Sequence, residues 1–326
     1  MQKLEELLPL AEELGFDAVG VASLDAVDDA QKAVFDRWLS DGRNGEMAYL
    51  ERNLPLRYDP RYGDSILADA KTVVVVAASY FPEKRQSVDA PQISKYAYGS
   101  DYHVVLRESL NRLGLLMTES MGAHSFRPIV DTVPFLERYW AERAGLGFLG
   151  RNHSLILGGK GSFFFLGELV TTMAFEPTSV RTDKPGAHCG TCRRCVDACP
   201  TGALTADGLD ARKCISYLTI EYRGEIPEEL GSHFGTRLYG CDTCQDVCPF
   251  NHRPPATKLF GTREEVLRLR DEDLADFTKE KYKALTKDSA LERVRFAQMR
   301  RNAEIYLRNK KDGGTSKSAF GSPYSG

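Results

Sequence analysis

The chain has 326 residues, of which 42% are hydrophobic and 27% charged, and its formal net charge is −3. These values are typical of a globular protein with room for two or three domains. No apolar run approaches the ~18 residues of a membrane span, and the first residues lack the apolar core of a signal peptide, so we expect a cytoplasmic protein without membrane contact.

Residues 1–180 alternate between helical and strand patterns, which predicts an α/β domain. The run 72–80 is continuous, apolar and β-branched, as expected of a strand buried on both faces. The sequence GGKG at 158–161 indicates a hairpin between the strands on either side of it. Helical patterns cover 4–14, 26–42, 102–121 and 134–144, and strand patterns cover 17–22, 72–80, 126–130, 153–157 and 162–174.

Two motifs in this region resemble cofactor sites but do not fit them. Residues 145–150 read G-x-G-x-x-G, yet they follow a predicted helix, which argues against a dinucleotide site and favours a tight turn with a close backbone approach. Residues 101–103 begin like the D-x-H-x-x-G motif by which some corrinoid proteins supply histidine to cobalt. Because Leu106 replaces the glycine, we expect His103 to be structural.

Asp131 lies between a predicted strand and a helix predicted to begin at Pro134. Its carboxylate could cap that helix by accepting backbone N–H bonds. It could instead be a proton donor at the end of a strand, where α/β folds place reacting groups, provided that its surroundings raise its pKa. The residues alone leave both interpretations open.

Eight cysteines form two runs, C-x2-C-x2-C-x3-C before Pro200 and C-x2-C-x3-C before Pro249, with Cys214 between them. Such runs are typical of two [4Fe-4S] clusters in which the fourth cysteine of each run binds the other cluster. Leu238 stands where the second run would begin, so Cys214 is the candidate replacement. The expected ligands are Cys189, Cys192, Cys195 and Cys248 for cluster one, and Cys199, Cys214, Cys241 and Cys244 for cluster two.

Zinc and disulfides explain this pattern less well. Zinc sites need neither a third closely spaced cysteine nor a proline directly after the last cysteine. Disulfides need an oxidising compartment. If Cys214 binds cluster two, Ser216 and Tyr217 lie beside that cluster.

Positive charge is concentrated near the C-terminus. Residues 279–311 hold eleven Lys or Arg and four Asp or Glu, a net of +7, whereas residues 1–278 carry −10. This asymmetry indicates a polyanionic partner, although a solvated helical face explains it equally well. We predict domains at 1–180, 181–255 and 256–311, the last a basic helical segment, and a Gly- and Ser-rich flexible tail at 312–326.

Ordered motifs along residues 1–309 resemble the epoxyqueuosine reductase family. They are Arg127-Pro128-x-Val130-Asp131-Thr132-x-Pro134, Glu137-Arg138, the glycines at 145, 147 and 150, Gly167-Glu168-Leu169, CISYLTIE at 214–221, Cys241-Asp242-x-Cys244-Gln245 and RVRFAQ at 293–298. The resemblance implies a cobalamin-binding α/β domain similar to that of reductive dehalogenases, joined to a ferredoxin-like domain with two [4Fe-4S] clusters. It implies reduction of epoxyqueuosine to queuosine at the wobble position of tRNA, the last step of queuosine biosynthesis. Many members add C-terminal helical repeats, so this chain looks like a shorter or truncated form.

The resemblance also implies residue roles. Asp131 matches the proton donor, and Arg57 a cobalamin contact. Cluster two would be the relay nearer the cobalamin, and cluster one would face an external low-potential electron donor. No histidine ligand to cobalt is implied, so we expect cobalamin with its base detached, bound to a monomer. Further cobalamin contacts are His153, Ser154, Ser216, Tyr217 and Asp242, and the candidates for tRNA phosphate contacts are Lys281, Arg295, Arg300 and Arg301.

Two alternatives stay open. A cobalamin-dependent reductase of a small molecule, similar to reductive dehalogenases, would not need the basic segment. A ferredoxin-type electron carrier would need neither a proton donor nor tightly bound cobalamin.

Overall fold

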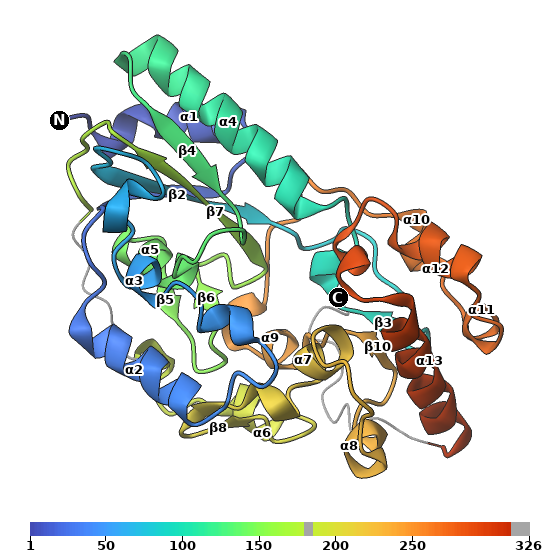
Figure 1. Cartoon of the computed structure of the whole chain (residues 1–326). Helices are drawn as coiled ribbons and strands as arrows, with labels where there is room; N and C mark the ends of the chain where they lie inside the picture. Colours follow the sequence, from blue (N-terminus) through green and yellow to red (C-terminus); the bar gives the residue numbers. More distant parts are fainter. Residues whose placement is uncertain (179–184, 314–326) are drawn as a thin grey trace.

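The computed structural model describes residues 1–178 and 185–313, and most of the predicted flexible tail lies outside the described residues (Figure 1). Its centre is a four-stranded sheet in which every neighbouring pair is antiparallel. The strand order is β1 (Ala18–Ser23), β2 (Thr72–Ser79), β7 (Phe164–Thr171) and β4 (Phe126–Ile129).

Strand β2 lies in the middle of the fold, and all eight of its residues are buried. One face of the sheet packs against α1 (Leu8–Glu13) and α4 (Tyr102–Met121). The other face packs against α3 (Leu54–Tyr58) and α5 (Glu137–Arg143), and Figure 1 shows the helices on the two sides. Both faces of β2 therefore need apolar side chains, which explains its continuous apolar run and confirms the predicted buried strand.

The predicted hairpin across residues 158–161 is wrong as a strand pair. The short strand β6 (Leu155–Ile156) pairs with β5 (Phe148–Leu149), and only an isolated bridge joins Leu157 to Gly161. Strand β7 pairs with β2 along its whole length and with β4 at residues 168–171, whereas β6 pairs with β5 outside that sheet.

The predicted tight turn in the G-x-G-x-x-G segment is confirmed. A Cβ on Gly147 would lie 2.1 Å from the Ile156 carbonyl oxygen, so only glycine allows this approach between β5 and β6. Helix α5 begins three residues later than predicted, with Leu136 at its N-cap, so Pro134 precedes the helix.

The cysteine-rich part consists of short elements around two loops. Its helices are α6 (Arg194–Asp197), α7 (Ile215–Ile220), α8 (Glu228–Ser232) and α9 (Thr243–Asp246), and β8 (Leu204–Thr205) pairs with β9 (Gly208–Leu209). Strand β10 (Arg237–Tyr239) runs parallel to β3 (Gln92–Ile93), which comes from the N-terminal half of the chain. The boundary at residue 180 stays a prediction, and this strand pair crosses it.

The C-terminal segment is helical, as predicted from its periodicity. It contains α10 (Glu264–Leu267), α11 (Asp271–Ala275), α12 (Lys279–Thr286) and α13 (Phe296–Lys311). A further helix, α2 (Asp29–Ser40), belongs to the N-terminal part of the chain. Helix α13 packs on β10 and buries Met299, Ala303 and Tyr306 in a core shared with Ile93. Within residues 1–178 and 185–313, no helix has the length and apolarity needed to cross a bilayer.

Candidate functional site

The structure places thiols of each expected group close enough to influence one another. Burial, followed by the proximity of Cys248, Cys189 and Cys192, raises the pKa of Cys195 to about 11. All eight cysteines are free thiols. A positive iron cluster would deprotonate them, because a bound metal ion inverts the local pKa balance.

The second group is arranged in the same way. Burial and then the neighbouring Cys241, with a smaller effect of Cys199, raise the pKa of Cys214 to about 11. Burial and then the neighbouring Cys241 and Cys214 raise the pKa of Cys244, and Cys195 of the first group raises it further. The two groups are therefore adjacent, which short-range electron transfer requires. Their assignment as cluster ligands stays a prediction.

The turn that follows β5 reaches both thiol groups, which sequence reasoning missed. The Arg151 backbone N–H donates to the Cys189 sulfur at 3.4 Å, and the Asn152 side chain donates to the Cys244 carbonyl at 3.3 Å. Both residues line the hollow around the first group together with Phe250. The sequence does contain a signal for this turn, because it comes directly after the G-x-G-x-x-G motif at residues 145–150.

Cys214 immediately precedes α7, and two predicted cobalamin contacts lie in the first turn of that helix. The backbone N–H groups of Ser216 and Tyr217 bond to the Cys214 sulfur and favour its thiolate. The Tyr217 hydroxyl accepts a hydrogen bond from the Glu46 backbone N–H at 2.7 Å, and the side chain is buried. Tyr217 thus fixes α7 against the turn at Gly45, where an added Cβ would lie 2.4 Å from the hydroxyl oxygen.

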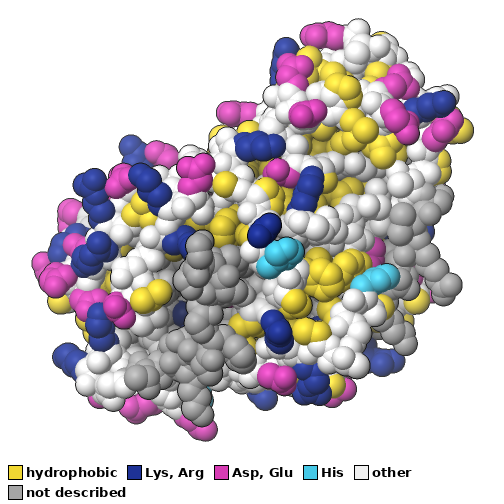
Figure 2. All heavy atoms as spheres, turned by 180° about the vertical axis from the view of Figure 1, so that it is seen from behind, with side chains coloured by type: hydrophobic (Ala, Val, Ile, Leu, Met, Phe, Trp, Pro, Cys, Tyr) yellow, Lys and Arg dark blue, Asp and Glu magenta, His cyan; other side chains and the backbone are white. Residues whose placement is uncertain are grey.

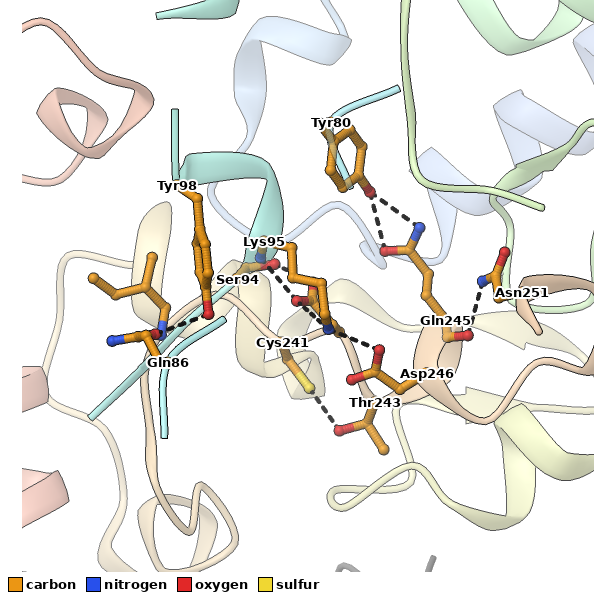
Figure 3. A network of polar contacts seen from close by, with 12 residues as sticks. Tyr80, Gln86, Ser94, Lys95, Tyr98, Cys241, Thr243, Gln245, Asp246 and Asn251 are labelled. Carbon is orange, nitrogen blue, oxygen red and sulfur yellow. Dashed lines mark hydrogen bonds and ion pairs between the residues drawn. The ribbon is translucent and has the colours of Figure 1, made fainter. Parts of the chain in front are cut away.

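Asp242, another predicted cobalamin contact, is held in a polar network between the two halves of the chain. Its carboxylate accepts from the Ser94 hydroxyl, from the Lys95 backbone N–H at 2.8 Å, and from the Lys95 ammonium at 3.2 Å. The same ammonium lies 2.7 Å from Asp246, and Figure 3 shows Lys95 pointing toward this residue. Contact of Asp242 with a cofactor is untested, and both of its oxygens already have partners.

Asp131 lies just beyond β4 with φ +49°, a backbone conformation that aspartate tolerates better than most residues. Its side chain is 48% exposed, and Oδ2 accepts from the Tyr102 hydroxyl and lies 3.9 Å from His103 Nε2. The Asp131 backbone N–H donates to Glu137 Oε1 at 2.7 Å. The helix-cap interpretation is therefore wrong, because Leu136 is the N-cap of α5 and makes no side-chain cap bond.

Charged and aromatic side chains from distant segments surround Asp131. Burial and then Asp131 raise the pKa of Glu137 well above its usual value, and burial lowers the pKa of Arg138. Burial raises the pKa of Tyr49, and the nearby carboxylates of Glu221 and Asp131 raise it further. The sequence alone assigns no role to these residues, because their arrangement around Asp131 depends on the fold.

Arg57 and His153 lie around the same site. Arg57 is 6% exposed, its Nε has no hydrogen-bond partner among the described residues, and its guanidinium lies 5.7 Å from the Phe35 ring centre. Burial and then Arg138 lower the pKa of His153 to about 4, so its ring is neutral at pH 7. Arg138 also donates to the His153 carbonyl oxygen, and the Ser154 N–H donates to the Asn152 side chain at 3.2 Å.

Three of the four predicted phosphate contacts are on the surface. Lys281 and Arg300 have side chains 40% and 60% exposed, and Arg295 is also exposed. Arg301 differs, because its guanidinium donates to the carbonyl oxygens of residues 218, 222 and 224 at 2.6–2.9 Å. On the face shown in Figure 2, acidic and basic side chains are mixed on the side of the C-terminal helices.

The chain matches two protein families. Residues 188–251, which include all eight cysteines, match the 4Fe-4S double cluster binding domain, and residues 57–132 match the epoxyqueuosine reductase QueG domain DUF1730. An epoxyqueuosine reductase of Cellulophaga algicola is 37% identical over 295 residues, which cover 90% of this chain and 94% of the relative.

Two solved structures share the fold. Epoxyqueuosine reductase from Streptococcus thermophilus aligns with a TM-score of 0.81 and 29% identity, covering 94% of this chain and 81% of that chain. Epoxyqueuosine reductase with an epoxyqueuosine-modified tRNA-Tyr stem loop aligns with a TM-score of 0.77 and 32% identity, with the same coverage of 94% and 81%. The predicted architecture, an α/β domain joined to a two-cluster domain and C-terminal helices, is confirmed.

Proposed function

The chain belongs to the epoxyqueuosine reductase family, and on this basis we propose that it reduces the epoxide of epoxyqueuosine in tRNA to the alkene of queuosine. One observation carries the proposal: a single turn joins the Asp131 site to the second thiol group. Arg138 of the site donates to the His153 carbonyl, and Asn152 of the same turn donates to the Cys244 carbonyl. A proton donor and an electron path therefore converge on one place.

The thiol groups would hold the two [4Fe-4S] clusters. We assign Cys189, Cys192, Cys195 and Cys248 to cluster one, and Cys199, Cys214, Cys241 and Cys244 to cluster two. We take cluster two as the inner relay because its Cys244 contacts Asn152, the direct neighbour of His153, whose carbonyl oxygen accepts from Arg138 of the Asp131 site, whereas Cys189 contacts Arg151, one residue farther along the turn. Cluster one, beside Arg151 and Arg194, would receive electrons from an external low-potential donor.

Cobalamin fits the side chains around Asp131, and when bound it supplies a two-electron reductant from electrons delivered singly. Arg57 has a buried N–H that lacks a partner among the described residues, and the neutral ring of His153 can donate or accept. Ser154, Ser216, Tyr217 and Asp242 complete the proposed contacts, the last two through groups that are also bonded within the protein.

Asp131 is the proposed proton donor to the epoxide oxygen. Tyr102 fixes one carboxyl oxygen, and Glu137 fixes the backbone N–H, so both ends of the residue are positioned. The substrate base would leave its stack to enter this site, while Lys281, Arg295 and Arg300 contact phosphates. Arg301 would contact phosphate only by giving up carbonyl partners. Action as a cytoplasmic monomer is part of the same proposal.

The test is mass spectrometry of nucleosides from epoxyqueuosine-containing tRNA, incubated anaerobically with cluster-loaded protein, cobalamin and a strong reductant. Queuosine should form, and Asp131→Asn should slow its formation about a hundredfold to ten-thousandfold while both cofactors stay bound. Asp69→Asn is the matched control, because Asp69 is exposed and also has a positive φ, +57°. Unchanged epoxyqueuosine with wild-type protein carrying both cofactors would refute the proposed function.

A further inference from the structure

Glu168, in the middle of β7, is a buried carboxyl group that the mechanism above does not use. It is 0% exposed, and neither carboxyl oxygen has a hydrogen-bond partner among the described residues. It pairs in register with Ile129 of β4 and Val75 of β2, both of which belong to the core on the α5 side of the sheet. An unpartnered carboxylate in such surroundings is strongly disfavoured, so this group is held as the neutral acid.

Two other carboxyl groups are close enough to act on it electrostatically. Glu137 begins α5, which packs on β7, and its carboxylate accepts the Asp131 backbone N–H at 2.7 Å. The Glu137 and Asp131 side chains also contact each other, and both carboxyl groups act on Glu168 to raise its pKa further after burial. Three carboxyl groups thus run from the buried sheet to the half-exposed Asp131.

We propose that Glu168 stores, and Glu137 transfers, the second proton that the reaction consumes, with Asp131 as the residue that delivers it. This inference rests on the proposed function, because it concerns the proton supply of that reaction. It gives a role to Glu168, for which the apolar packing around it offers no reason to be acidic, and a second role to Glu137 besides its hydrogen bond to the Asp131 backbone.

The proton count explains the need for a second acid. Opening the epoxide places one proton on its oxygen, giving a hydroxyl, and loss of that hydroxyl as water takes a second proton. Two electrons from the external low-potential donor complete the conversion to the alkene. Asp131 carries one proton at a time, so it must be reprotonated while the substrate base covers the site and limits access of water. Glu137 would pass a proton to Asp131 and recover one from Glu168 through a side-chain rotation or a bridging water, because Glu168 has no direct hydrogen bond among the described residues. Glu168 would regain its proton by the same route between turnovers.

Neighbouring groups are poorer sources for this proton. Tyr102 donates to Asp131, but burial and then the Asp131 charge raise its pKa, so a phenolate there is unfavourable. Arg138 and Arg57 also lie close to Glu137, and both keep their protons far above neutral pH. The His103 side chain is 35% exposed, whereas Glu168 is fully buried. Its Nδ1 is bonded to Asp101 at 2.8 Å, and its Nε2 lies 3.9 Å from Asp131.

The experiment compares Glu168→Gln, Glu137→Gln and the control Glu108→Gln, since Glu108 is exposed on α4. Infrared spectroscopy of the cluster-loaded protein without substrate, at neutral pH, should show a protonated carboxyl band that shifts in D2O and is lost in Glu168→Gln. In single turnovers of epoxyqueuosine-containing tRNA, both site variants should form queuosine at least about tenfold more slowly than the control, with tRNA affinity unchanged.

If Glu168→Gln does not fold, Glu168→Met serves instead, because an apolar side chain of similar size suits this core. The proton store is overturned if the band is absent from wild type or persists in the Glu168 variant, or if that variant turns over at the rate of Glu108→Gln. When wild type forms queuosine and the Glu168 variant matches it, only this inference fails. When wild type with both cofactors forms none, the proposed function fails and the inference fails with it.

Discussion

Replacing Lys95 by methionine should destabilise the protein by about 3–5 kcal/mol, the usual cost of removing one partner of a buried ion pair. Its side chain is 11% exposed, and its ammonium lies 3.2 Å from Asp242 and 2.7 Å from Asp246, which are 9% and 35% exposed. At an effective dielectric of 20, one such pair is worth roughly 4–5 kcal/mol before desolvation. The more exposed Asp246 pair contributes less because water screens it.

The sign of this contribution allows a test at neutral pH. Burial lowers the pKa of Lys95, but Asp242 and Asp246 outweigh burial, so its pKa lies above the usual value. A raised lysine pKa stabilises the folded state fully below the unfolded pKa of about 10.4, and the contribution is lost only as the pH rises through the folded pKa. The whole effect is therefore present at pH 7.

The assay is anaerobic urea unfolding of cluster-loaded protein, together with the rate at which a chelator removes iron. Lys84→Met is the control, because Lys84 is exposed and the change should stay within about 0.5 kcal/mol. Adding Asp242→Asn and Asp246→Asn to Lys95→Met should restore much of the loss, since no buried charge is then left unpaired. A Lys95→Met protein within about 1 kcal/mol of the control would refute the assignment of this network as a buried ion pair.

Two further predictions concern pH and salt. The pKa of His153 is lowered to about 4, so between that value and its usual 6.5 the unfolded state binds more protons, and stability should fall as the pH falls through this window. His153→Gln should flatten that loss in urea midpoints compared at about pH 7 and about pH 5; equal slopes for the two proteins would contradict the lowered pKa. Arg300→Ala should reduce the slope of log affinity for tRNA against log salt by roughly 0.7 without destabilising the protein. Arg301→Ala should instead cost about 1–3 kcal/mol in unfolding because it leaves carbonyl oxygens unbonded; a loss confined to tRNA binding would reverse this assignment.

The sequence predicted best those features that short spacing determines. The expected cysteine groups followed from the x2 and x3 intervals and from Leu238 in the vacant position, and in the structure Cys195 lies near Cys189, Cys192 and Cys248, and Cys214 near Cys199 and Cys241. The division into two ligand sets stays a prediction. The buried strand β2 followed from an unbroken apolar run. Each of these signals is contained within a few residues, so no knowledge of the tertiary fold was needed.

The sequence was less informative where a residue's role depends on a distant partner. Residues 153–157 and 162–174 looked like a hairpin, but β7 is already paired on both edges by strands from elsewhere in the chain. Arg301 looked like a phosphate contact, yet carbonyls some eighty residues earlier accept its guanidinium protons. Residue type gave the chemistry of these side chains, and the fold decided which partner used it.

The glycine motif shows how the two kinds of information meet. Its spacing resembled a dinucleotide site, and its context excluded one. In the structure, Gly147 allows β5 to approach β6 closely, which directs the chain into the turn at residues 150–154. That turn contacts Arg138, near Asp131, through His153, and Cys244 of the second thiol group through Asn152. Because one short, tightly constrained turn makes both contacts, local backbone geometry sets how the Asp131 site lies relative to the second thiol group. If Asp131 is the proton donor and this group holds the inner cluster, as we propose, the same turn positions proton and electron delivery for one substrate.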